Sequence, residues 1–256
     1  MTALDLSPAP GAAPRSRALV AQLAMELKLV LRNGEQLLLT VIIPTVLLIL
    51  FAKAPIANLP KPRIDFLLPG ILALAVMSTA FTGQAIGTGF ERRYGVLRRL
   101  GTTPLTRSSL ITAKTAAVVG VEILQVGLLC LVAFALGWSP HGSVLPVVGL
   151  LLLGTAAFST LGLLMAGTLR AEATLAAANL VYLILLVLGG VAFPLTDFSS
   201  GVRDVLQYLP ISALSTGLRH VLARGHGVPA RSWLTLAVWT VIGGAAAARW
   251  FRWDQL

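Results

Sequence analysis

Six long stretches of this chain carry almost no charge, and these uncharged stretches limit the possible folds more than any other feature. A charged side chain at the centre of a lipid bilayer costs several kcal/mol, so membrane spans are largely free of charge. A helix of about 20 residues, rising about 1.5 Å per residue, crosses a hydrocarbon layer roughly 30 Å thick. The pattern predicts transmembrane helices at about residues 36–52, 66–90, 114–138, 144–169, 173–196 and 232–248.

The composition supports a membrane fold. Apolar residues make up 56% of the 256 residues and charged residues 12%, whereas about a quarter of an ordinary soluble domain is charged. A soluble chain of this length would need more charged side chains around its core, so we expect lipid to cover most of the outside. The predicted fold class is all-α integral membrane, with six transmembrane helices in one domain over residues 35–256.

The distribution of Lys and Arg predicts the orientation. Six spans place both termini on one side of the membrane, and that side carries 13 of the 20 Lys and Arg residues. The side richer in these residues faces the cytoplasm by the positive-inside rule. Both termini are therefore expected in the cytoplasm.

The first 34 residues are predicted to stay out of the membrane core. Residues 1–14 contain three prolines and are interpreted as a disordered cytoplasmic tail without the features of a cleaved signal. Residues 15–34 are predicted to form an amphipathic helix in the membrane interface. Its apolar side comprises Leu19, Leu23, Leu27, Val30 and Leu31, and its polar side comprises Arg17, Gln22, Glu26, Lys28 and Arg32.

Residues 91–107 form the longest predicted cytoplasmic connection and the most charged stretch of the chain. Val96, Leu97 and Leu100 make a small apolar face on a short helix, which Gly101 and Pro104 would end. A short helix with cations and an exposed apolar edge suits the docking of another protein. Simple positive-inside anchoring would explain the arginines but not the glycine, the proline or the apolar edge.

Glu122 is the one acid well inside a predicted span, and Gln125 lies on the same helix face three residues later. An ionised carboxylate facing lipid would be heavily penalised, so Glu122 must face protein or a wet cavity, or be neutral. The functional interpretation places both residues on a transport path or at a subunit interface. The structural alternative is a hydrogen bond to a neighbouring helix.

Several classes of protein are disfavoured by the sequence. The net charge of +10 comes from residues that flank spans, without the basic and aromatic face of a nucleic-acid-binding protein. Cys130 is the single cysteine, and the three histidines are scattered, so neither a metal site nor a disulfide framework is predicted. No phosphate-binding loop and no catalytic cluster occurs in the sequence. The chain is therefore predicted not to be an enzyme.

The 91–107 segment resembles the signature of ABC type-2 transporter permeases, in which an acid and a Gly-Thr-Leu-like triplet precede a Leu and a Thr-Pro-x-Ser/Thr-Arg turn. Arg93 and Arg98 stand where many members have acids. The matching residues are Glu91, Gly95, Leu97, Leu100, Thr103, Pro104, Thr106, Arg107 and, further on, Lys114.

A second segment is similar to the same family. Residues 189–195, with Pro194, end the fifth predicted span as in these permeases, and an outer segment with Pro210 and Arg219 follows. Two short amphipathic helices separated by Pro210 are expected to form a hairpin at the outer leaflet. Their apolar residues are Val202, Val205, Leu206 and Leu209 in the first helix, and Leu214, Leu218, Val221 and Leu222 in the second.

The resemblance implies the membrane subunit of a bacterial ATP-driven exporter. Such a subunit moves a hydrophobic or amphipathic molecule, drug-like or lipid-like, out of the cytoplasm, as in multidrug export and antibiotic resistance. ATP and Mg would be bound by a separate pair of ABC ATPase subunits, and no cofactor by this chain. The residues implied in ATPase coupling are Glu91, Arg92, Gly95, Leu97, Leu100, Pro104 and Arg107.

Such an exporter contains a second membrane subunit, identical or homologous. Gly83-x-x-x-Gly87 and Gly162-x-x-x-Ala166 would allow close approach of helices, within the chain or between subunits. Two other classes remain open. A gradient-driven secondary transporter would usually carry more intramembrane charges and internal repeats than this chain has. A non-transporting membrane scaffold is compatible with the composition.

Overall fold

The computed structural model describes residues 14–34, 38–53, 62–103, 107–191 and 198–252, and these residues form helices and connecting turns without any strand. η1 and η2 are π-helical stretches. The elements are α1 (Arg15–Arg32), η1 (Leu38–Ile42), α3 (Ile43–Lys53), α4 (Arg63–Val76), η2 (Met77–Gly83), α5 (Gln84–Arg93), α6 (Val96–Leu100), α7 (Arg107–Ala135), α8 (Val144–Thr168), α9 (Ala171–Leu188), α10 (Ser200–Leu206), α11 (Pro210–Leu222) and α12 (Ala230–Trp250).

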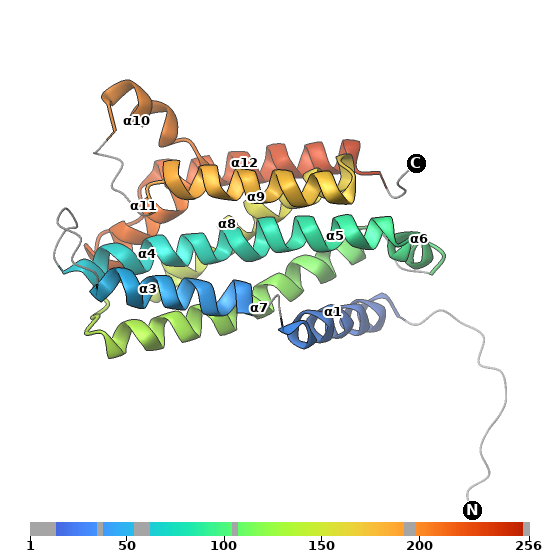
Figure 1. Cartoon of the computed structure of the whole chain (residues 1–256), viewed down its shortest axis with the longest axis horizontal. Helices are drawn as coiled ribbons and strands as arrows, with labels where there is room; N and C mark the ends of the chain where they lie inside the picture. Colours follow the sequence, from blue (N-terminus) through green and yellow to red (C-terminus); the bar gives the residue numbers. More distant parts are fainter. Residues whose placement is uncertain (1–13, 35–37, 54–61, 104–106, 192–197, 253–256) are drawn as a thin grey trace, which may run out of the picture.

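The long helices run side by side along one axis (Figure 1). α4, η2 and α5 follow one another without a break, and α6 turns away at the end of α5. α6 and the last residues of α12 lie at one end of the bundle, which we name the α6 end, and α10 projects at the opposite end. The all-α class predicted from the sequence is confirmed for the described residues.

Within the part of the chain that the structure describes, four helices are long and apolar enough to cross a membrane: Arg63–Arg93, Ser109–Ala135, Val144–Thr168 and Ala171–Leu188. They coincide with four of the six predicted spans, although α9 ends at Leu188 rather than near residue 196, and Gly190 follows with φ of +67°. The first predicted span contains a shorter apolar helix, Thr40–Lys53, and the last corresponds to α12. Six spans remain a prediction.

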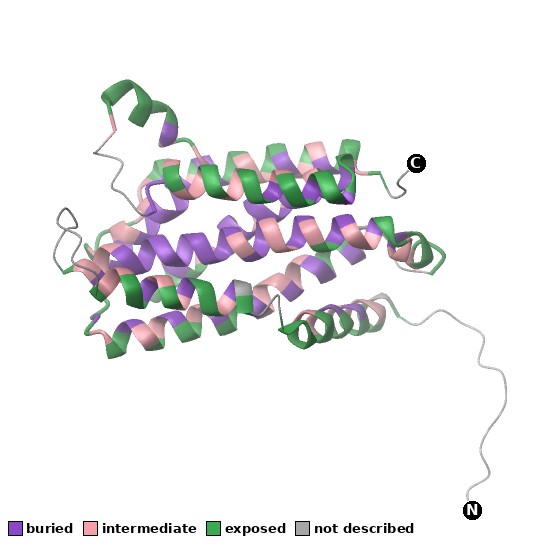
Figure 2. Ribbon diagram, viewed as in Figure 1, coloured by how far each residue is buried: buried purple, intermediate pink, exposed green. Residues whose placement is uncertain are grey.

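The four candidate spans differ in how central they are. Within the Arg63–Arg93 helix 83% of the most apolar window is buried, against 17% for α9. Figure 2 shows the same contrast between a buried α4 and an exposed α9. The α4–η2–α5 helix therefore lies at the centre of the bundle. α9 has an apolar face that the rest of the described chain leaves exposed. The exposed apolar side chains of α9 include Leu180, Leu183, Ile184 and Val187.

The predicted faces of α1 are corrected by the structure. α1 packs against α7, and Gln22 and Glu26, which we assigned to the solvated polar side, are buried. The contact is close, because a Cβ added at Gly120 of α7 would lie 2.8 Å from Leu27. The assignment failed because Lys114 of α7 forms an ion pair with the carboxylate of Glu26 and allows it to be buried.

The predicted hairpin at the outer leaflet is also corrected. α11 packs against α4, α8 and α12, and Leu214 and Leu218 are fully buried. The apolar stripe that indicated a helix lying on lipid therefore faces the protein core. In α10, by contrast, Val202 and Val205 are exposed while Leu206 is buried.

Candidate functional site

The α6 end gathers most of the residues predicted to couple the chain to an ATPase. α5 ends at Arg93, and Gly95 reverses the chain with φ of +70°, a conformation that an L side chain rarely adopts. The predicted short helix follows as α6. The hydroxyls of Thr102 and Thr103 donate to the carbonyls of Arg99 and Leu100 at 2.7 and 2.6 Å, which caps the last turn of α6.

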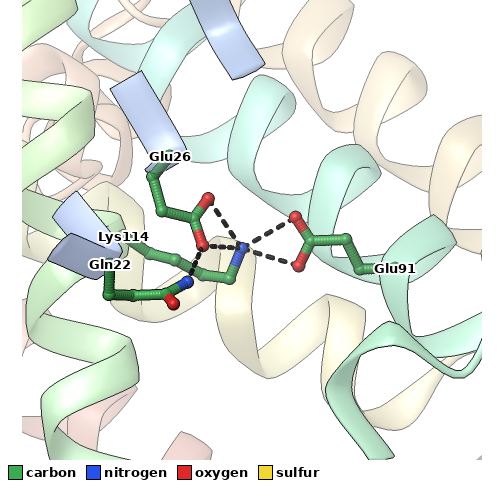
Figure 3. A network of polar contacts seen from close by, with 4 residues as sticks. All are labelled: Gln22, Glu26, Glu91 and Lys114. Carbon is green, nitrogen blue, oxygen red and sulfur yellow. Dashed lines mark hydrogen bonds and ion pairs between the residues drawn. The ribbon is translucent and has the colours of Figure 1, made fainter. Parts of the chain in front are cut away.

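Lys114 connects three helices at this end. Its Nζ lies 2.6 Å from Oε2 of Glu91 in α5 and 3.1 Å from Oε1 of Glu26 in α1. The Gln22 amide donates to Glu26 at 2.8 Å (Figure 3). Lys114 and Glu26 are nearly fully buried. A buried charge with two partners is far less screened than a surface pair, so this network ties α1, α5 and α7 together.

Arg92, which follows Glu91 in α5, is also buried. Its guanidinium donates to the carbonyl oxygen of Leu169 and, at 3.4 Å, to that of Arg252. The resemblance implied that Glu91 and Arg92 take part in ATPase coupling. Both side chains have partners inside this chain, and a role in coupling stays a prediction.

The exposed surface of the segment comes from other residues. Arg93 forms an ion pair with Glu172 of α9 at the surface, and Tyr94, Arg98 and Arg99 are exposed. Sequence reasoning singled out none of these for contact. The run of arginines carries no signal that separates these residues from Arg92, which the fold turns inward.

The predicted apolar edge is smaller than expected. Leu97 is 1% exposed within this chain, whereas Val96 and Leu100 are half-buried, so Val96 and Leu100 supply what apolar surface the edge has. Pro104 lies outside the described residues. Arg107 is the first residue of α7, and its side chain is not among those described.

Glu122 and Gln125 are buried side by side in the middle of the bundle. Glu122 accepts a hydrogen bond of 2.5 Å from Thr155 of α8. The amide of Gln125 donates to the Thr40 carbonyl of η1 and accepts from the Thr79 hydroxyl of η2 at 3.1 Å. These are contacts of the kind that the structural alternative predicts. A place on a transport path stays a prediction.

Arg219 lies inside the bundle near the end opposite α6. Its guanidinium donates to the carbonyls of Phe66 and Val191 at 3.2 and 3.1 Å and stacks 4.0 Å from the centre of the Phe66 ring. A Cβ at Gly70 would meet both Arg219 and the Val191 carbonyl, so this glycine makes the approach possible. Pro210 is the buried first residue of α11, and Pro194 lies outside the described residues.

A cavity of about 580 Å³ opens between η1, α3, η2, α5 and α9. This volume falls within the range of roughly 300–1,000 Å³ typical of small-molecule sites. Its walls are mostly apolar and aromatic, with a few hydroxyls and two amides. The lining includes Ile43, Thr82, Ile86, Phe90, Asn179 and Tyr182.

Of the two predicted glycine pairs, one is used inside the chain. A Cβ at Gly162 would lie 2.8 Å from the carbonyl oxygen of Phe81, so α8 and η2 approach closely here. At Gly87 a Cβ would meet nothing within 4 Å. Only the Gly83–Gly87 pair is therefore placed where another chain could approach.

The continuous apolar helices and the family of the sequence define an integral membrane transport component. Residues 58–249 match the family described as ABC-2 family transporter protein, and the chain belongs to this family. It is accordingly the membrane component of an ABC transporter, works with an ABC ATPase, and is not itself an ATPase. No curated protein matches the chain.

Proposed function

We propose that this chain is the permease subunit of an ATP-driven exporter that moves a hydrophobic or amphipathic molecule out of the cytoplasm. The observation that carries the proposal is the continuity of α4, η2 and α5. One helix joins the charged turn at α6 to the wall of the 580 Å³ cavity. A displacement of α6 by an ATPase would therefore reach the cavity along a single rigid element.

The proposed substrate is drug-like or lipid-like. The mostly apolar lining of the cavity supports a hydrophobic body, and its hydroxyls and two amides support a molecule with some polar groups. A transporter of such molecules would act in multidrug export and contribute to antibiotic resistance.

The proposed assembly is a pair of membrane subunits, identical or homologous, above a pair of ABC ATPase subunits. ATP and Mg bind to the ATPase subunits, and this chain binds no cofactor. We propose that it lies in the inner or plasma membrane of a bacterium with six spans and both termini in the cytoplasm. The α6 end then faces the ATPase.

Reconstitution tests the proposal. The chain purified alone should neither bind nor hydrolyse ATP, and together with its co-purifying ATPase in liposomes it should export a fluorescent amphipathic dye in an ATP-dependent manner. The matched control carries an ATPase whose phosphate-loop lysine is replaced. Specific ATP hydrolysis by the contaminant-free chain, or dye export that follows an ion gradient and ignores ATP, would contradict the proposal.

A further inference from the structure

A second, polar cavity of about 270 Å³ lies between α1, α5 and α7. Lys114 and the two glutamates that it contacts form part of its wall (Figure 3). The wall also contains the polar side chains of Thr79, Gln84 and Thr88. This space is large compared with the roughly 30 Å³ that one water occupies in the liquid.

The charges of this wall do not balance. Glu26 and Glu91 supply two carboxylates and Lys114 supplies one ammonium, and the described lining contains no other charged side chain. With both carboxylates ionised, one negative charge remains without a counterpart. Buried charges in proteins are paired, so an excess of this kind favours a bound cation.

Gln84 is an independent sign of a ligand. The side chain is 7% exposed and lines the polar cavity. Neither its Oε1 nor its Nε2 has a hydrogen-bond partner among the described residues. A buried amide left unsatisfied costs stability, so such a group in a cavity wall fits a site that a polar ligand completes.

The polar cavity adjoins the apolar one. Both are lined by Asn33, Gly83 and Gly87, and a side chain added at Gly87 would meet open space. An acidic space and an apolar space therefore meet where α5 carries no side chain.

We propose that the two cavities form one binding site for an amphipathic primary amine. The ammonium group occupies the polar cavity, where its three N–H donors face the carboxylates of Glu26 and Glu91 and the amide oxygen of Gln84. The apolar body lies in the larger cavity against side chains such as Phe90 and Tyr182. This inference rests on the proposed function, because it names the substrate class of the exporter.

Binding to the purified chain tests the site without the ATPase. The chain is placed in nanodiscs of zwitterionic lipid, and binding of radiolabelled dodecylamine is compared with that of N-acetyldodecylamine, which has the same tail and no charge. Empty nanodiscs give the lipid background. We expect saturable binding of the amine and weaker binding of the neutral amide. Equal binding of the two compounds, or no saturable binding of the amine, overturns the proposal.

Glu26→Gln tests the excess charge. The variant keeps the side-chain shape and leaves Lys114 paired with Glu91. We expect the amine affinity to fall about thirtyfold or more, the lower end of the loss seen when one member of a buried charge pair is removed. Glu172→Gln removes an exposed carboxylate outside both cavities and should leave the affinity unchanged. An unchanged affinity in Glu26→Gln overturns the proposal.

Gly87→Leu tests the junction and is a second variant that the fold can accept, because the added side chain has open space. We expect it to abolish binding of dodecylamine. Gly127→Leu is the matched control, since Gly127 also borders open space but on α7, outside both cavities. Full amine binding by Gly87→Leu would exclude a joint site.

The two proposals fail differently. Amine binding without ATP-dependent export in the reconstituted complex supports the site and contradicts the exporter. ATP-dependent export of other molecules, without amine binding to the chain, supports the exporter and contradicts the site.

Discussion

Lys114 holds the carboxylates of two residues that lie 88 and 23 positions away in the chain. Removing one partner of a buried ion pair costs about 3–5 kcal/mol because an uncompensated charge remains. Lys114 has two partners, so the loss of either carboxylate leaves the other in place. The network can therefore accept a change at Glu26 or at Glu91 more readily than a change at Lys114.

Arg219→Lys should destabilise the chain. An ammonium cannot reproduce the planar fork that donates to two carbonyls and stacks on Phe66. We expect a loss of about 1.5–3 kcal/mol, the value of a hydrogen bond to a charged group, measured as a lower melting temperature in detergent. Arg203→Lys on exposed α10 is the control and should melt with the parent. A parental melting temperature for Arg219→Lys would contradict this role.

Glu122→Gln should preserve the fold and alter transport. The glutamine oxygen can accept the hydrogen bond from Thr155, so expression and assembly should match the parent. Replacing the ionisable carboxyl at a buried position changes the environment beside Gln125, and we expect a changed export rate or substrate preference in liposomes. If every tested substrate is exported as by the parent, Glu122 is a structural residue only.

At the residue scale, the sequence predicted which residues lie in the charged network better than it predicted which residues contact one another. The family resemblance singled out Glu91 and Lys114, and both lie in the network. It could not pair Lys114 with Glu26, because that contact joins helices that are distant in sequence and depends on how α1 packs. Arg92 was assigned to a partner because a run of arginines gives no sign of which one the fold turns inward.

At the scale of elements, α6 presents charge to its surroundings and keeps one of its two leucines inside. Leu97 is buried within this chain, while Arg98 and Arg99 are exposed. We therefore expect stability and ATPase contact to depend on different residues of this short helix. Substitutions on the two sides of α6 can separate these effects.

Leu97→Ala should lower the melting temperature of the isolated chain, because truncating a buried leucine costs about 2–5 kcal/mol. The double variant Arg98→Gln, Arg99→Gln should keep the parental melting temperature and reduce co-purification of the ATPase. Arg249→Gln, an exposed arginine at the same end of the bundle, is the control. Undiminished co-purification in the double variant would show that these arginines only anchor the chain.

The sequence predicted where the helices lie in the chain better than it predicted what each helix packs against. Charge-free stretches predicted the helices that became α7, α8 and α9 because exclusion of charge from lipid acts on each segment alone. The position of α11 did not follow, since an apolar stripe fits a protein core as well as a lipid surface. The π-helical stretch η2 gave no sequence signal, and it carries Thr79 and Thr82 at two of the polar positions described above.

At the scale of the whole molecule, the orientation of the bundle decides which end meets the ATPase. A chain with the single cysteine replaced, Cys130→Ala, allows single cysteines to be labelled with a membrane-impermeant maleimide. Cysteines at exposed Pro140 and Gly201 should be labelled in intact cells, and cysteines at Arg98 and Arg170 only after permeabilisation. Labelling of Arg98→Cys in intact cells would reverse the orientation.

The same labelling decides between four spans and six. Among the described residues, only four helices meet the length and hydropathy expected of a span. The two remaining predicted spans correspond to η1 with α3, and to α12. Exposed positions lie at both ends of each segment: Arg32 and Lys53 around the first, Gly227 and Arg252 around the second.

If both segments cross the membrane, cysteines at Lys53 and Gly227 are labelled in intact cells, and cysteines at Arg32 and Arg252 only after permeabilisation. We expect this result, because α12 has 21 residues, enough at about 1.5 Å per residue to cross the hydrocarbon layer. Labelling of both ends of either segment from one side would mean that it does not span, and would place the two termini differently from the proposed assembly.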